Sequence, residues 1–223
     1  MFRSGPMPTS RFGPLATAFE KGELTVPGYL ELLHFQGPGV DVVLDRIRSA
    51  LSTPEPQVWV NALFDDPNWR PHLVGAAALL LDETEALKSS AIWHAIDGGS
   101  WVTPQLVVTA YFVDPAFPEQ TMRRLESRCA IEAPAGLSPP ARHSATGPAG
   151  TPARSAKLLA SLTCMGIRVP RLVTDVERIS EDHDMKSLRE RDIDRSADIV
   201  TSWYDSVLAV LSARKRTLMP RFR

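Results

Sequence analysis

The spacing of apolar residues constrains the fold of this chain more than any other feature of its sequence. Apolar side chains recur at i, i+3, i+4 and i+7, the spacing that places them on one face of an α-helix. The first such stripe consists of Val40, Val43, Leu44, Ile47 and Leu51. A second stripe, within residues 193–211, predicts a long C-terminal helix from near Asp194 to near Lys215.

Dipeptides of one kind, an Asp or Thr followed by Pro, mark predicted helix starts. The first residue accepts a hydrogen bond from an otherwise unpaired backbone N–H, and Pro at the first helical position loses no hydrogen bond. The predicted starts are Asp66-Pro67, Thr103-Pro104, Asp114-Pro115 and Thr151-Pro152. Thr84 with Glu85 predicts one more start, and Gly98-Gly99 predicts a helix end.

Strand signals are short. Val58-Trp59-Val60 and Leu106-Val107-Val108 are rich in β-branched residues, but we interpret both as helical, with a short hairpin near residues 56–64 as an alternative. Residues 133–152 hold five prolines and three glycines, which excludes a regular element and predicts a flexible loop. We therefore predict one all-α domain over residues 1–223, either a helical bundle or a short helical-repeat array. The loop divides a larger N-terminal helical part from a C-terminal helical part.

Charge and cysteine content bear on the class of protein. The formal net charge is −1, so neither nucleic acid nor a membrane is an expected partner. Residues 1–112 hold 7 Lys and Arg against 12 Asp and Glu, whereas residues 113–223 hold 18 against 14. The longest apolar stretch, residues 74–81, is too short to span a bilayer. Cys129 and Cys164 lack metal-binding spacing, which indicates reduced thiols in a cytoplasmic protein without a metal or cofactor.

A short pattern recurs at a spacing of 33 residues. Pro71-His72-Leu73-Val74 is followed by Pro104-Gln105-Leu106-Val107, and Pro170-Arg171-Leu172-Val173 repeats the P-x-L-V core at twice that spacing. Together with the small residues 76–78, this pattern resembles degenerate HEAT or armadillo-like helical repeats over roughly residues 55–130. The resemblance implies a stacked helical array with an extended binding surface rather than a deep catalytic pocket.

Two clusters of aromatic and polar residues are the candidate sites. The first consists of Trp69, Arg70 and His72, and includes the two residue types most enriched at binding hot spots. The second consists of His94, Asp97 and Trp101. His94 and Asp97 are three residues apart on a predicted helix, so Asp97 can orient a general-base imidazole. A structural role, with the Trp in the core or the His–Asp pair at a helix end, is the alternative for each cluster.

No motif identifies a reaction. The chain has no dinucleotide fingerprint, phosphate loop, HExxH or GxSxG, and Gly98-Gly99-Ser100-Trp101 lacks the final glycine of a nucleophile elbow. Residues 181–184 (EDHD) cannot all ligate one ion, because consecutive helical residues point in different directions. No metal site is therefore predicted.

The leading functional hypothesis is a non-enzymatic module that binds a protein partner. An adaptor fits this class, as does a toxin-neutralising immunity-type inhibitor whose acidic N-terminal half faces a basic toxin. One alternative is an enzyme of unrecognised type that uses His94 and Asp97 in a Trp-lined cleft. The other is a structural subunit of a larger assembly, which would leave an apolar patch uncovered on the monomer.

Overall fold

The protein is described by a computed structural model that covers residues 9–82, 84, 87–131, 152–180 and 183–214. Every regular element among these residues is a helix, which confirms the predicted all-α class. In chain order the helices are η1 (Thr9–Phe19), α1 (Gly28–His34), α2 (Gly39–Leu51), α3 (Pro56–Phe64), α4 (Trp69–Leu81), α5 (Ser90–Asp97), α6 (Thr103–Val113), α7 (Phe117–Ile131), α8 (Pro152–Gly166), η2 (Pro170–Leu172), α9 (Val173–Ser180) and α10 (His183–Ala213).

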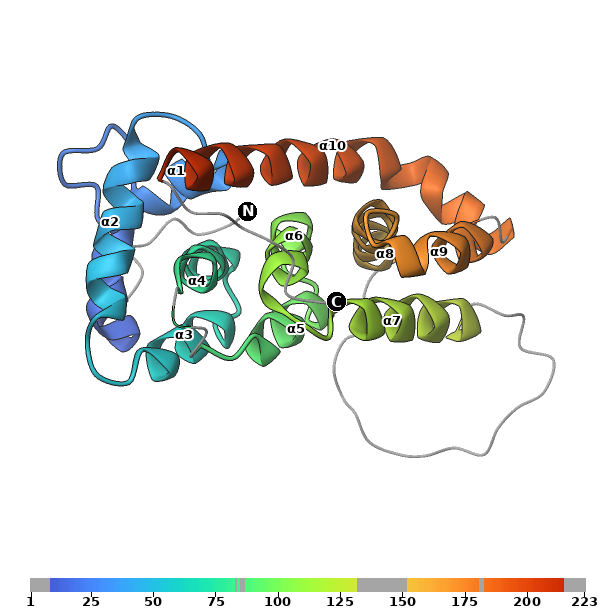
Figure 1. Cartoon of the computed structure of the whole chain (residues 1–223), viewed down its shortest axis with the longest axis horizontal. Helices are drawn as coiled ribbons and strands as arrows, with labels where there is room; N and C mark the ends of the chain where they lie inside the picture. Colours follow the sequence, from blue (N-terminus) through green and yellow to red (C-terminus); the bar gives the residue numbers. More distant parts are fainter. Residues whose placement is uncertain (1–8, 83, 85–86, 132–151, 181–182, 215–223) are drawn as a thin grey trace.

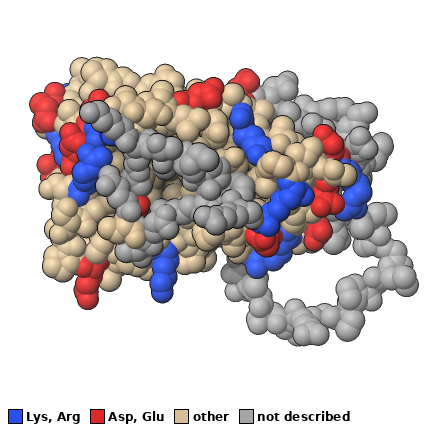
Figure 2. Space-filling model, in the orientation of Figure 1, with Lys and Arg blue, Asp and Glu red and all other residues tan. Residues whose placement is uncertain are grey.

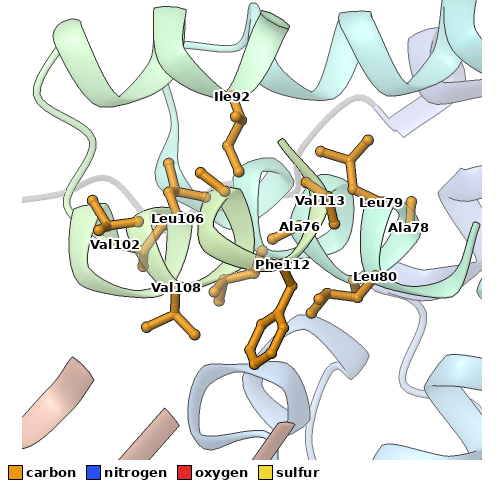
Figure 3. Packing of buried hydrophobic residues seen from close by; sticks show 14 of the residues in the cluster. Ala76, Ala78, Leu79, Leu80, Ile92, Val102, Leu106, Val108, Phe112 and Val113 are labelled. Carbon is orange, nitrogen blue, oxygen red and sulfur yellow. The ribbon is translucent and has the colours of Figure 1, made fainter. Parts of the chain in front are cut away.

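Two helices, α4 and α6, lie side by side at the centre of the molecule (Figure 1). α4 is buried from Pro71 to Leu81, and α6 is buried along its whole length. A helix that is apolar on all sides has no face for water, so other helices must surround it. In Figure 3 the small side chain Ala76 of α4 lies beside Val113 of α6, and Ile92 of α5 points towards these two helices. This packing forms the middle of the hydrophobic core.

The helices around this pair are amphipathic, as the predicted stripe in residues 40–51 illustrates. Within α2 the buried members of that stripe are Val40, Val43, Leu44 and Ile47, whereas Asp41 and Asp45 are exposed. The buried face of α2 packs against η1, α1 and α4. Each of these large aliphatic side chains contributes about 1.5–3 kcal/mol when it is removed from water. The period-3.6 pattern therefore predicted both the helix and the face that it buries.

The longest described helix, α10, runs along one edge of the molecule and crosses α6 and α8 (Figure 1). Its buried face carries Val200, Trp203, Val207 and Leu211. The indole N–H of Trp203 donates a hydrogen bond of 3.2 Å to the carbonyl of Leu32, which ties α10 to α1. The helix begins at His183, earlier than the predicted start near Asp194, and its end at Ala213 agrees with the prediction.

Three of the predicted helix starts lie at or near an observed helix start. α6 begins at the predicted Thr103-Pro104, but Thr103 is its first residue rather than its N-cap, and the Thr103 hydroxyl donates to the carbonyl of Ser100. α8 begins at Pro152. α4 begins at Trp69 rather than at Asp66-Pro67, because Asn68 is the N-cap and its side-chain oxygen accepts a hydrogen bond from the N–H of Arg70. The side chain of an earlier Asp can satisfy a turn before the helix, which a dipeptide alone does not distinguish from a cap.

Two other predicted starts are wrong. α7 begins at Phe117, whereas Asp114 ends α6 and its side chain accepts a hydrogen bond from the N–H of Ala116. Thr84 begins no helix: its N–H and hydroxyl both donate to the carboxylate of Asp82, and α5 starts only at Ser90. In each case an Asp side chain stabilises a turn that follows a helix end.

The strand-like segments are helical. Val58-Trp59-Val60 lies in α3 and Leu106-Val107-Val108 lies in α6, so the alternative hairpin near residues 56–64 is wrong. The predicted loop over residues 133–152 lies outside the described residues except for Pro152, the first residue of α8. Among the described residues no helix is both long and apolar enough to cross a bilayer.

The recurring P-x-L-V pattern falls on comparable positions in the two central helices. Pro71 lies in the first turn of α4 and Pro104 in the first turn of α6, where the missing N–H of proline costs no helical hydrogen bond. The third copy, which starts at Pro170, forms η2 and the first residue of α9 instead. The HEAT-like repeat remains a prediction.

Candidate functional site

A hollow of about 620 Å³ opens at the start of α4, where this helix meets the turn between α5 and α6. Four of the six predicted site residues line it: Trp69, His72, His94 and Trp101. Both predicted clusters therefore meet at one place, although about 25 residues separate them in the sequence. We call this space the first hollow.

The segment before α4 fixes one wall of the first hollow. Asp66 is buried, one of its carboxylate oxygens accepts a 2.7 Å hydrogen bond from the N–H of Asn68, and the other forms an ion pair with Arg11 of η1. Asn68 in turn caps α4. These contacts hold the carbonyl of Asp66 beside the first turn of the helix, where His72 reaches it.

The turn between α5 and α6 fixes the opposite wall. Gly98 and Gly99 end α5 as predicted, with the N–H of Gly98 donating to the carbonyl of His94. Gly99 has a φ of 75°, a left-handed conformation in which a β-carbon would be strained. The N–H of Ser100 then donates back to the carbonyl of Ala95. This reversal of the chain directs Ser100 towards the start of α4.

His72 bridges the two walls. Its Nδ1 lies 2.7 Å from Oγ of Ser100, and its Nε2 lies 2.7 Å from the carbonyl oxygen of Asp66. Because a carbonyl oxygen only accepts, Nε2 must carry the proton, and Nδ1 is left to accept the hydroxyl proton of Ser100. The arrangement therefore fixes the tautomer of the ring.

The environment of His72 keeps the ring neutral. Its side chain is buried, with 4% of the residue exposed, and it lies against the ring of Phe64. Burial lowers the pKa of His72 from 6.5 to about 4, against a smaller opposing effect of the Phe64 backbone. At neutral pH the imidazole is thus unprotonated and its Nδ1 is available as an acceptor.

Aromatic rings continue from the first hollow across the surface. The ring of Trp69 lies 5.0 Å from that of Trp101 and 6.0 Å from that of Tyr29, which it meets edge-on. The guanidinium of Arg70 lies over the rings of both Trp69 and Tyr29. Trp69 and Arg70 are half-buried, so the first predicted cluster is neither a core residue with a free Arg nor a fully exposed hot spot. The rings instead support one another and Trp101.

Trp101 is the most exposed large apolar residue among the described residues, at 55%. It lines the first hollow and also a second hollow of about 520 Å³, whose other walls include Leu33 of α1 and Trp203 of α10. Lys157 of α8 lines both hollows as well, donates a hydrogen bond to the carbonyl of Trp101 and lies over its ring. Trp101 and Lys157 therefore form a ridge between the two hollows.

Each hollow contains one exposed carboxylate. Asp65 lines the first and Asp198 the second, and neither forms an ion pair with any described residue. On the face seen in Figure 2, Lys and Arg side chains lie beside Asp and Glu side chains at both ends of the molecule. The two hollows thus hold two exposed carboxylates against one lysine, Lys157, which lines both.

The second predicted cluster is divided. His94 is exposed and lines the first hollow, but both carboxylate oxygens of Asp97 accept hydrogen bonds from Arg124 of α7, at 2.8 and 2.7 Å. Arg124 is itself buried and lies 4.2 Å from the ring centroid of Trp93. Asp97 therefore joins α5 to α7. In this hollow the histidine with a side-chain hydrogen-bond partner is His72, which bonds to Ser100, whereas Asp97 bonds to Arg124.

The described residues hold no group of three or more His, Cys, Asp or Glu side chains arranged to bind a metal. Of the two cysteines, Cys164 lies half-buried in α8, and burial raises the pKa of its thiol. The side chain of Cys129 lies outside the described part. The first hollow is lined by hydroxyl, imidazole, carboxylate and indole groups.

Sequence reasoning missed Ser100, Lys157, Asp65 and Asp198. Ser100 had a signal, the Gly98-Gly99-Ser100 turn, but the absent final glycine of the elbow motif led away from it. Lys157 and Asp198 come from helices that follow the Pro-rich segment, and no local pattern connects them with Trp101. Their proximity depends on how α8 and α10 pack.

No model of a known protein family matches this chain, and neither does any curated protein or any solved structure in the comparisons made. The case for a function therefore depends on the residues of the site.

Proposed function

We propose that the protein is a binding module that recognises a basic segment of a protein partner across the ridge formed by Trp101 and Lys157. The observation that carries this proposal is the 55% exposure of Trp101 between two hollows that it lines on either side. The apolar surface of an exposed tryptophan is unfavourable in water, and a partner that covers this surface gains free energy of binding. Trp is also among the residues that most often dominate binding energy.

The shape of this surface supports an extended polypeptide as the ligand. Two hollows of similar size, about 620 and 520 Å³, adjoin at Trp101 and Lys157, which line both of them. A segment that crosses the ridge places one side chain in each hollow and its backbone over Trp101. Trp69, held by Tyr29 and Arg70, supports the indole from beneath, so little conformational entropy is lost when the partner binds.

The charges support a basic partner. The carboxylate of Asp65 lies in the first hollow and that of Asp198 in the second, and neither forms an ion pair with a described residue. A Lys or Arg on either side of an apolar residue would pair with both, and opposite charges across an interface accelerate encounter and fix register. A basic partner is compatible with the inhibitor or adaptor role expected from the sequence, including an immunity-type inhibitor of a basic toxin.

The third function considered, a structural subunit, has less support. It requires a continuous exposed apolar patch. Among the described residues the exposed large apolar side chains are Val58 of α3, Trp101 and Ile167, and these lie on separate segments of the fold. Of the three, only Trp101 lines a described hollow.

A selection of random dodecapeptides displayed on phage against the immobilised protein tests the proposal. We expect enrichment of peptides in which an apolar residue is flanked on both sides by Lys or Arg. Trp101→Ala should abolish this enrichment, and the double variant Asp65→Asn, Asp198→Asn should remove the preference for basic residues. Val58→Ala, which shortens an equally exposed side chain on α3, is the matched control and should select the same peptides as the wild type.

Enrichment that survives Trp101→Ala would contradict the assignment of the ridge as the binding surface. Enrichment of acidic peptides would contradict the charge argument while leaving the ridge in place.

A further inference from the structure

We propose that Ser100 is a nucleophile and His72 its general base, so that small carboxylic esters that enter the first hollow acylate Oγ of Ser100. This activity goes beyond the recognition of a protein partner and does not depend on it. From the sequence, one alternative is an enzyme that uses His94 and Asp97 in a Trp-lined cleft. The present proposal keeps the cleft but uses Ser100 and His72.

Three groups have the geometry that nucleophilic catalysis requires. A serine hydroxyl becomes a nucleophile when a base lies within hydrogen-bond reach and a further group orients that base. Oγ of Ser100 lies 2.7 Å from Nδ1 of His72, and the carbonyl of Asp66 lies 2.7 Å from Nε2 on the other side of the ring. The carbonyl serves as the orienting group, because it holds the tautomer that leaves Nδ1 free to take a proton.

The orienting group is itself held on several sides. The carboxylate of Asp66 is fixed by the N–H of Asn68 and by Arg11, and Asn68 caps the helix that carries His72. Ser100 is placed by the reversal at Gly99. Ser100 is thus positioned by backbone contacts, and His72 by a capped helix and by the carbonyl of Asp66.

The protonation state supports the same assignment. Burial lowers the pKa of His72 to about 4, so the base is unprotonated at neutral pH. The charged and titratable groups around the ring are Asp66 with its partner Arg11, and Asp65, His94 and Lys157 in the walls of the hollow. A weakly basic imidazole gives slow proton transfer, and we therefore expect slow acylation.

The first hollow supplies the remaining requirements. Ser100 and His72 both line it, beside the aromatic side chains of Phe64, Trp69 and Trp101, which suit an apolar or aromatic acyl or alcohol group. The backbone N–H of Trp101, the residue after the serine, donates no hydrogen bond to any described residue. An N–H at this position commonly stabilises the oxygen that becomes negative during acyl transfer.

The reaction balances without any other reactant than water. Oγ of Ser100 forms a bond to the ester carbonyl carbon while its proton passes to Nδ1 of His72. The bond between that carbon and the alcohol oxygen breaks, and the alcohol leaves with the proton from Nδ1. Water then attacks the acyl carbon and gives a proton to Nδ1, the bond to Oγ breaks, and Oγ recovers the proton. The products are a carboxylic acid and an alcohol.

The test is covalent labelling of the whole protein with an alkyl fluorophosphonate, followed by peptide mass spectrometry. The reagent forms a phosphorus–oxygen bond to an activated serine and releases fluoride and a proton. We expect the label on Ser100 in the folded protein and at least about tenfold less in urea, where the pair with His72 is lost. Ser100→Ala should show no label at this position, and Ser49→Ala, which removes an exposed hydroxyl on α2 away from both hollows, should label Ser100 as the wild type does.

His72→Asn tests the role of the base and should slow labelling of Ser100 by about 100-fold, within the range expected for loss of a general base. Circular dichroism verifies that this variant is folded. If it does not fold, the comparison of folded and urea-unfolded wild type decides the question. p-Nitrophenyl butyrate serves as the ester, and we expect slow release of nitrophenolate that Ser100→Ala abolishes.

The absence of label on Ser100 in the folded wild type would overturn the proposal, and the Ser100–His72 hydrogen bond would then be only structural. Labelling that is equally fast in folded and unfolded protein would overturn it as well. Trp101→Ala separates the two proposals. Loss of peptide binding with labelling retained supports both, whereas peptide binding by a wild-type protein that does not label supports the binding function alone.

Discussion

The body of α4 and His72 in its first turn are both buried, yet they are held by different interactions. From Leu73 to Leu81 the helix is surrounded by apolar side chains. Its packing against α6 depends on apolar contact, which, unlike a hydrogen bond, has no preferred direction. In the first turn His72 is buried to the same degree but forms two directed hydrogen bonds, to Ser100 and to Asp66. The body of α4 therefore carries stability, whereas its first turn carries a polar arrangement that costs stability when a partner is lost.

This contrast explains why a hollow exists where it does. Apolar side chains close the space between α4 and α6 almost completely. At the ends of the same helices the chain turns at Gly98-Gly99 and at Asp66-Pro67, and polar groups there need partners rather than close packing. Function is thus expected at the ends of the central helices and not between them.

The largest expected effect comes from removing a side chain in the apolar body. Phe112 of α6 is fully buried and lies against Tyr204 of α10, with 5.3 Å between the ring centroids. Phe112→Ala should lower the free energy of unfolding by about 3–5 kcal/mol, because it removes apolar contact and leaves a cavity. Urea denaturation measures this change. A loss below about 1 kcal/mol would mean that the centre of the fold is less tightly packed than described.

A second effect is confined to the polar turn and depends on pH. The pKa of His72 is about 4 in the folded protein and about 6.5 when unfolded, so between these values the unfolded state binds the extra proton. Stability is then fully present above pH 6.5 and falls by about 3 kcal/mol as the pH is lowered to 4. His72→Gln should flatten this part of the pH profile, which urea denaturation at a series of pH values records. An unchanged slope in the variant would assign the pH dependence to other groups.

A third effect separates binding from stability. Trp101→Ala should lower the binding affinity for a selected basic peptide by about 30-fold or more, since a central anchor residue is lost. The free energy of unfolding should change by less than about 1 kcal/mol, because the side chain is 55% exposed. Titration calorimetry and urea denaturation together measure the two quantities. Equal losses of affinity and stability would make Trp101 a structural residue.

The smallest effect is expected on the second predicted cluster. His94→Ala leaves the bonds between Asp97 and Arg124 intact, so stability should change by less than about 0.5 kcal/mol. Labelling of Ser100 should also stay within about twofold of the wild type, because His94 lines the hollow without bonding to the pair. Abolished labelling would return His94 to the role of base that the sequence first indicated.

Periodicity predicted the helices well, because burial of one face leaves a direct trace in the order of apolar residues. The stripe in α2 and the class of fold both followed from it. Helix starts were predicted less well, since Asp66 and Asp114 form turns with their side chains and a dipeptide does not distinguish a turn from a cap.

The composition of the site was predicted only in part. Trp69, His72, His94 and Trp101 line one hollow, but the sequence placed them in two separate clusters and did not indicate that these clusters meet. The partners of His72 and Asp97 were not predictable, because Ser100 and Arg124 reach them through the packing of separate helices. The spacing of His94 and Asp97 on one helix favoured a contact between them, but Asp97 instead bonds to Arg124 of another helix.

The most direct test of the binding function is a pull-down from native lysate that compares the wild type with Trp101→Ala and Val58→Ala, read by mass spectrometry. We predict one basic protein recovered in equal amounts with the wild type and Val58→Ala, and lost with Trp101→Ala. Recovery of the same partner by all three proteins, or of an acidic one, would contradict the assignment of the Trp101 ridge as the surface on which this protein acts.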